Sequence, residues 1–376
     1  MQEISLNIID LFILFGTFQG FILAIVLLTT KRMRRTSNLF LALLLFVFSV
    51  LNLDTIIHSS LYEVYPISIY LPIYFFTLIP VSLYFFITYL TQPNYKFQRK
   101  DILLFILPAI EASYQLASFL HKLWTGNFGY DLYERYRVVI SVFEVIGIMG
   151  VFYFLPTSIK RLNQYQKLLY DNYAEVEEKN LNWLRVTLIG GAGIATIWFL
   201  VVLLRYTSTQ DQLLLARAVW LGLTIMICWI GYSMLIRQGL LDSSIFGILD
   251  EQEKEEKKLE LSSKTDAHYQ KILELLEQEK IYRNSNLNLS ILAENTGLSR
   301  GYVSQIINQK RKQNFFEFIN YFRVEEVKKE MLNPDMQHLS ILGIAQNAGF
   351  KSKSTFNAVF KKITKMTPSE YRKKQA

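Results

Sequence analysis

The chain has 376 residues and a net charge of +8, and its composition is 51% hydrophobic and 14% aromatic. This length allows two or three domains, and the apolar content is too high for an ordinary soluble protein. The single cysteine, Cys228, excludes an intramolecular disulfide and a cysteine-rich metal site. The charge is uneven, because residues 1–240 carry +4, residues 241–265 carry −3 and residues 266–376 carry +7.

Seven apolar stretches before residue 240 approach the length of about 20 residues that a helix needs to cross a bilayer. They are residues 8–29, 38–57, 67–90, 102–120, 138–158, 184–204 and 213–236. Core helices of a large soluble protein are the alternative, but seven such stretches joined by short charged loops favour a membrane. The sequence therefore predicts a seven-helix transmembrane sensor domain over residues 1–240.

Basic residues predict the orientation of this domain, because cytoplasmic loops are enriched in Lys and Arg. With the N-terminus outside, the outer loops hold only Lys122, Arg135 and Arg137. The inner loops then hold eleven basic residues: Lys31, Arg32, Arg34, Arg35, Lys96, Arg99, Lys100, Lys160, Arg161, Lys167 and Lys179. We expect a multi-pass protein of the bacterial inner membrane whose C-terminus lies in the cytoplasm.

Ionisable residues inside the apolar stretches are costly in lipid and are therefore candidates for function. Under this orientation six of them lie between mid-membrane and the outer face: Asp10, Asp54, Glu111, Glu144, Arg205 and Arg217. We expect a polar sensor cavity formed by Asp54, Glu111, Glu144 and Arg217, in which Arg217 pairs with Glu144 or Glu111. The alternative for Asp10, Arg205 and Arg217 is that they extend from helix ends into the headgroups. The sequence does not define the signal.

Residues 241–265 form a charged linker with alternating charge from Asp250 onward. Such a run is typical of an exposed helix with ion pairs at i,i+4 spacing. A flexible solvated tether is the alternative.

Residues 266–376 carry the same helix-turn-helix pattern twice. Alanine lets two short helices cross closely, and glycine suits the left-handed residue that ends the first helix. The first copy consists of Leu292, Ala293, Gly297, Leu298, Val303 and Ile306, and the second of Ile344, Ala345, Gly349, Phe350, Phe356, Val359 and Phe360. Apolar residues at helical spacing over residues 315–332 predict a helix that joins the copies and ends before Asn333 and Pro334.

This region resembles the AraC family of bacterial transcription factors over about 110 residues. Its connecting helix is similar at Phe316, Phe318, Ile319, Arg323, Glu325 and Leu332. Its C-terminal signature is similar at Gly349, Phe350, Ser352, Ser354, Phe356, Val359, Phe360, Lys361, Lys362, Met366, Thr367, Pro368, Ser369, Tyr371 and Arg372. The soluble sugar-binding barrel usual in that family is absent, and the predicted membrane helices take its place.

The resemblance implies that two recognition helices of one chain enter successive major grooves of double-stranded DNA, about 34 Å apart. The expected DNA-binding residues are Ser299, Arg300, Gly301, Tyr302, Ser304 and Gln305 in the first helix, and Lys353, Ser354, Asn357 and Lys361 in the second. Gln305 and Asn357 are the predicted base readers, because an amide can bond adenine at two positions. Gly301 and Ala358 stand where family members often place long polar side chains, which shifts specificity toward fewer contacts or toward DNA shape.

Together these features predict an all-α protein, a membrane-bound one-component transcriptional regulator that senses an extracytoplasmic or membrane signal. The alternative is a membrane transporter or membrane enzyme with a regulatory cytoplasmic tail. The sequence has no HExxH, GxSxG or Walker pattern and its four histidines are scattered, so we expect no catalytic residue, cofactor or metal. A homodimer stays open, because no heptad run is long enough to indicate one.

Overall fold

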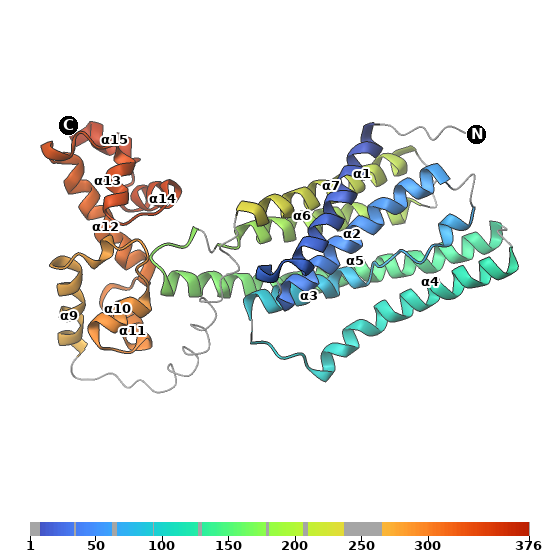
Figure 1. Cartoon of the computed structure of the whole chain (residues 1–376), viewed down its shortest axis with the longest axis horizontal. Helices are drawn as coiled ribbons and strands as arrows, with labels where there is room; N and C mark the ends of the chain where they lie inside the picture. The colour runs from blue at the N-terminus through green and yellow to red at the C-terminus, as the bar shows by residue number, and fades with distance from the viewer. Residues whose placement is uncertain are drawn as a thin grey trace. The chain divides into compact units, whose positions relative to one another are not determined.

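The computed structural model describes residues 8–33, 35–61, 66–92, 94–126, 130–177, 180–205, 210–236 and 265–375. Every regular element within these ranges is helical, in agreement with the predicted all-α class (Figure 1). The chain divides into an N-terminal unit, Met1–Asn163 with Leu181–Gln238, and a C-terminal unit, Gln164–Asn180 with Gly239–Ala376. The predicted linker, residues 241–265, lies outside the described residues except for Thr265.

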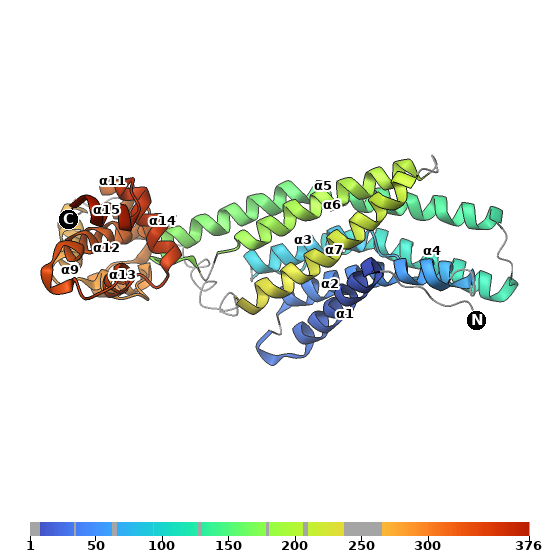
Figure 2. The same cartoon turned by 90° about the horizontal axis from the view of Figure 1, so that it is seen from above.

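The described part of the N-terminal unit contains seven α-helices, several of which run side by side (Figure 1 and Figure 2). Helix α2 packs against α1 and α3, while α7 packs against α1, α2 and α6. Short 3-10 segments, η1 (Lys31–Met33), η2 (Pro66–Tyr70) and η3 (Arg99–Phe105), lie between them. The α-helices are α1 (Ile8–Thr29), α2 (Thr36–Leu61), α3 (Leu78–Thr91), α4 (Ile106–Thr125), α5 (Tyr130–Asn172), α6 (Asn182–Leu204) and α7 (Gln210–Ile236).

Six helical segments of the described chain are long and apolar enough to cross a membrane, judged by length and composition. Helix α3 is apolar but has only 14 residues. The continuous helix predicted over residues 67–90 is therefore wrong, because η2 ends at Tyr70 and α3 begins at Leu78. Pro72 accounts for the break, since it lacks an N–H donor and disfavours helical geometry in the residue before it.

In the C-terminal unit the structure describes the end of α5, most of the segment that follows it, and, from residue 265 onward, nine shorter helices. These are α9 (Thr265–Glu277), η6 (Ile281–Arg283), α10 (Leu289–Thr296), α11 (Arg300–Arg311), α12 (Phe315–Leu332), η7 (Pro334–Met336), α13 (Ile341–Asn347), α14 (Lys353–Thr364) and α15 (Pro368–Gln375). The predicted joining helix over residues 315–332 is confirmed as α12. Its position lets one helix serve both copies of the pattern.

Two hydrophobic cores meet along α12. The first gathers α9, α10 and α11 around Phe315, Phe318 and Ile319 from the first half of α12. The second gathers α13 and α14 around Val324, Val327 and Met331 from its second half. Burial of both ends of one helix fixes the separation of the two helix-turn-helix motifs, α10–α11 and α13–α14.

Candidate nucleic-acid interface

A side-chain cap begins every helix of the two motifs. Ser299 accepts a hydrogen bond from the backbone N–H of Tyr302 at the start of α11, and Ser352 accepts one from Thr355 at the start of α14. Asn288 and Ser340 cap α10 and α13 in the same way. Such caps satisfy N–H groups that the helix itself leaves without partners, and they fix where each helix begins.

The predicted turn glycines are found in the left-handed backbone region, Gly297 at φ 68° and Gly349 at φ 101°. A Cβ added to Gly297 would meet nothing within 4 Å. One added to Gly349 would lie 2.5 Å from the carbonyl oxygen of Tyr282 and 2.9 Å from that of Arg283. Glycine is therefore required at position 349 for two reasons: its positive φ angle and the close approach of the second motif to η6.

The inward face of α11 is as predicted, because Val303, Ile306 and Ile307 are buried. Gly301, Ser304 and Gln305 are partly exposed on the other face. Asn308, three residues beyond Gln305 on that face, is exposed, and the sequence prediction missed it. Its i+3 spacing from Gln305 was the signal that could have found it.

Tyr302, which the sequence placed among the DNA-binding residues, is buried. This side chain is 7% exposed, its ring packs edge-on against His268, and its hydroxyl lies 3.2 Å from His268 Nδ1. Spacing of four residues places Tyr302 on the same helix face as buried Ile306, and α9 covers that face. Tyr302 therefore belongs to the core of the first motif.

Helix α14 presents the predicted set. Lys353, Ser354, Asn357 and Lys361 are exposed, while Phe356 and Phe360 are buried. The neighbouring Lys362 forms an ion pair of 2.7 Å with Glu317 of α12. The base-reading and phosphate-binding roles of this set stay predictions.

Arg323 of α12 is fully buried and connects both motifs. Its Nε donates to the carbonyl oxygen of Tyr282 at 2.8 Å and its Nη2 to that of Asn284 at 3.0 Å. Its guanidinium also lies 5.7 Å from the ring centre of Phe350 in the second motif. Burial lowers the pKa of Arg323 to about 10, so the group stays cationic at neutral pH.

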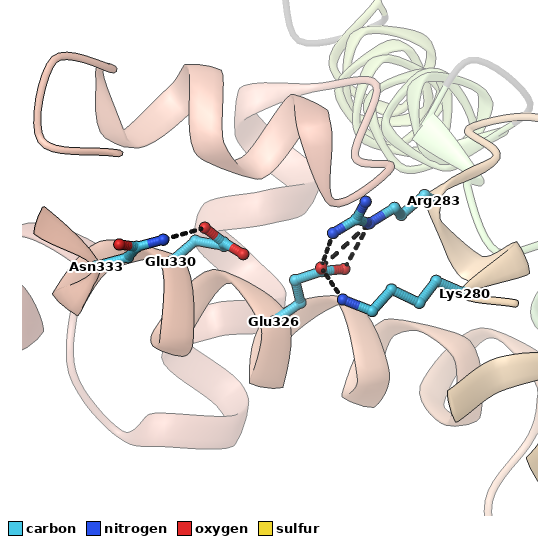
Figure 3. A network of polar contacts seen from close by, with 5 residues as sticks. All are labelled: Lys280, Arg283, Glu326, Glu330 and Asn333. Carbon is cyan, nitrogen blue, oxygen red and sulfur yellow. Dashed lines mark hydrogen bonds and ion pairs between the residues drawn. The ribbon is translucent and has the colours of Figure 1, made fainter. Parts of the chain in front are cut away.

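A second polar contact ties η6 to α12 (Figure 3). Glu326 accepts from Arg283 Nε at 3.1 Å and from Lys280 Nζ at 3.2 Å. Burial alone would raise the pKa of Glu326, but hydrogen bonds from Arg283, Tyr282 and Lys280 outweigh it and hold this pKa below its ordinary value. Arg323 and Glu326 thus link η6 to α12, the helix that contributes to both hydrophobic cores.

Residues 292–374 match the family described as "Helix-turn-helix domain". The "Probable transcription factor PqrA" of Proteus vulgaris is 32% identical over 101 residues, which cover 27% of this chain and 80% of that protein.

The chain belongs to this family of helix-turn-helix transcription regulators.

The AraC-type resemblance of the C-terminal region is thereby confirmed. Two uncharacterized HTH-type transcriptional regulators of Staphylococcus aureus, one of them from strain COL, are 30% and 29% identical over 102 residues. The match covers 27% of this regulator but only 13% of each of those proteins. No solved structure matches the chain.

The N-terminal unit of the regulator buries three of its four predicted cavity residues: Asp54, Glu111 and Glu144. The expected pairing of Arg217 is wrong, because Arg217 is exposed and Arg205 holds Glu144 instead, at 2.9 Å. Arg205 also donates to Ser141 at 2.8 Å. Arg205 thus makes its contacts within the N-terminal unit.

Glu111 has a structural partner that the sequence did not reveal. Its carboxylate accepts from the backbone N–H of Phe76 at 3.1 Å and of Thr77 at 3.0 Å, where the chain is unwound before α3. Gln115, one turn later, accepts from the N–H of Tyr74 at 3.0 Å. Side chains of α4 therefore satisfy backbone N–H groups that the unwound segment leaves without helical partners.

A cavity of about 100 Å³ lies within the N-terminal unit and is mainly apolar. Among the described residues, Glu144 is the one ionisable group in its lining, so Asp54, Glu111 and Arg217 do not line this cavity. The lining residues are Leu44, Phe48, Leu51, Phe76, Ile79, Leu83, Glu144, Gly147, Ile148, Val151, Leu155, Thr187, Leu188, Gly191, Ile194, Ala195, Trp198, Val219, Trp220, Leu223 and Met226.

Proposed function

We propose that the protein is a membrane-bound one-component transcriptional regulator, whose N-terminal unit detects a signal and whose C-terminal unit binds promoter DNA through α11 and α14. The observation that carries this proposal is the presence, in one chain, of a tandem helix-turn-helix domain and six apolar membrane-length segments. Large apolar side chains exposed on α1, α4 and α6, among them Phe12, Leu123 and Ile189, favour a lipid environment.

The cytoplasmic location of the DNA-binding helices has independent support. Counting of basic residues assigns the loop between α5 and α6 to the inner side. The end of α5 and the segment that follows it, Gln164–Asn180, belong to the same compact unit as the recognition helices. The same side of the membrane therefore holds the loop and the recognition helices. We count η2, the unwound segment and α3 as one further crossing beside the six membrane-length segments, which makes seven and puts the proposed N-terminus outside.

We assign base reading to Gln305 and Asn357 and add the exposed Asn308, because amides can donate to and accept from base edges. Arg300, Lys353 and Lys361 are assigned to phosphates, and the remaining helix-start residues to positioning. Signal detection is assigned to the cavity beside Glu144. Its apolar lining and the buried Glu144–Arg205 pair suit a small, largely apolar molecule with one polar group.

The test is DNA occupancy of the full-length protein in cells, compared with that of a Gln305→Ala/Asn357→Ala variant expressed in the same membrane fraction. We expect discrete promoters to be occupied by the wild type and lost in the variant. Solute uptake into proteoliposomes without any promoter occupancy would overturn the proposal in favour of a transporter.

A further inference from the structure

The segment that follows α5 contacts the beginnings of both recognition helices. We call residues 172–177 the docking segment. At the first helix, Arg300 Nη2 of α11 donates to Asn172 Oδ1 at 3.3 Å. At the second, Thr355 Oγ1 of α14 donates to Glu175 Oε1 at 2.6 Å, and the backbone N–H of Lys351 donates to Glu175 Oε2 at 3.3 Å.

Glu177 adds a second carboxylate at the start of α14. It accepts from the hydroxyls of Ser352 and Ser354, and from Thr355 Oγ1 at 3.3 Å. Burial would raise the pKa of Glu177, but the hydrogen bonds from Ser352, Ser354 and Thr355 outweigh it and lower this pKa, so the group is ionised at neutral pH. Two anionic side chains therefore occupy one helix start.

The docking segment is built into the domain and does not merely lie on its surface. Ala174 is 0% exposed and belongs to the core of the first motif. Its carbonyl oxygen accepts from Asn320 Nδ2 at 2.8 Å, and its N–H donates to the carbonyl oxygen of Leu287 at 3.4 Å. Beside it, Tyr173 pairs with Asn288 in an isolated β-bridge. These contacts hold the two carboxylates in place.

The groups that donate hydrogen bonds to Glu175 and Glu177 are of the kind that donate to DNA phosphates. Hydroxyls, backbone N–H groups and helix N-termini bind phosphate oxygens, and the helix dipole favours an anion there. A carboxylate satisfies the same donors with the same charge sign. A phosphate brought to the start of α14 would find its donors occupied and would be repelled by two negative charges.

We propose that the docking segment is an intramolecular competitor of DNA, in which Glu175 and Glu177 take the place of a backbone phosphate at α14 and Asn172 engages Arg300 at α11. The inference rests on the proposed function. Release of the segment frees both recognition helices for DNA. Because the segment joins α5 to α6 in sequence, a rearrangement of either helix acts on it directly, which supplies a route from signal to DNA binding.

The experiment compares DNA affinity of the full-length protein in lipid nanodiscs, using a promoter fragment found by occupancy mapping. The Glu175→Gln/Glu177→Gln variant keeps side-chain size and removes two charges. The matched control is Glu274→Gln/Glu277→Gln, which makes the same charge change at exposed positions of α9. We expect the first variant to bind about tenfold more tightly than wild type, a free-energy difference of about 1.4 kcal/mol. The control should change affinity much less.

Hydrogen exchange of the wild type provides a second measurement. Adding the promoter fragment should increase exchange of the amides of residues 174–177 while decreasing exchange at the start of α14. Equal affinity of the docking-segment variant and the control, or a segment that stays protected on DNA, overturns the competitor proposal alone. Absence of binding to any duplex by wild type and both variants overturns the proposed function and the inference with it.

Discussion

The two helix-turn-helix motifs share one pattern but are completed differently. On its outward face α11 carries amides, Gln305 and Asn308, while α14 combines one amide, Asn357, with the lysines Lys353 and Lys361. The start of α14 also has hydroxyl donors held by carboxylates, whereas α11 meets a neutral amide, Asn172. We propose that the two motifs divide the work unequally, with more amides for base edges on the first and more lysines for phosphates on the second.

The largest effect should come from the turn glycines. Gly349→Ala forces a Cβ against the backbone of η6 and strains a positive φ, so we expect the unfolding free energy of the C-terminal unit to fall by about 3 kcal/mol or more. Gly297→Ala adds only backbone strain, so we expect it to lower the unfolding free energy by about 1 kcal/mol. Amide hydrogen exchange in α12–α14 measures both. Equal losses would mean that the approach of Gly349 to η6 is not a constraint.

The next effect concerns sequence reading. Gln305→Ala should cost about 1–3 kcal/mol on the preferred promoter while leaving binding to random duplex nearly unchanged. Competition titrations with the two DNA types measure the difference. A uniform loss on both would remove base reading from the first motif and with it the proposed division of work.

A smaller effect is expected from the contact that joins the motifs. Glu326→Gln should lower stability by about 1 kcal/mol at pH 7, a modest figure because Arg283 and Lys280 are nearly half exposed. The folded pKa of Glu326 lies below the ordinary value of 4.5, so its contribution is complete above that pH and is lost as the pH falls through the folded value. The gap between wild type and variant should therefore close in acid. Amide hydrogen exchange of η6, corrected for the pH dependence of intrinsic rates, measures this stability difference. A difference that does not change with pH would contradict the role given to the Glu326 charge.

The smallest effect concerns a single lysine of the second motif. Lys361→Ala should weaken binding to all duplexes alike and reduce the slope of log affinity against log salt by about one. Affinities at four or five salt concentrations give that slope. An unchanged slope would make Lys361 a solvated surface charge, and Lys353→Ala would then be the better probe.

Local sequence patterns predicted what depends on near neighbours. Alanine, glycine and apolar spacing located Val303, Ile306, Gly297 and α12, because helix faces and turns are set by residues three or four apart. The same reasoning misplaced Tyr302, whose partner His268 comes from another helix. Nothing local to α11 shows that α9 covers this side chain.

Contacts between residues far apart in the sequence also explain where the structure of the N-terminal unit differs from the sequence prediction. From the sequence we expected Arg217 to pair with Glu144 or Glu111, whereas packing of the helices brings Arg205 to Glu144. Glu111 was read as a cavity charge, yet its partners are backbone groups about 35 residues earlier in the chain. The break before α3 that needs Glu111 follows from Pro72, a local signal that the apolar run concealed.

Ala174 has a practical consequence for any severed form of this protein. A fragment that starts after α7 would lack residues 164–180, so Asn320 and Arg323 would lose the Ala174 carbonyl oxygen that accepts their hydrogen bonds. Such a fragment would be less stable, and it would also lack the carboxylates of Glu175 and Glu177 at the start of α14. The folded fragment would then bind DNA more tightly than the intact protein does. Because part of the fragment would be unfolded, the measured affinity would be lower than that of its folded form.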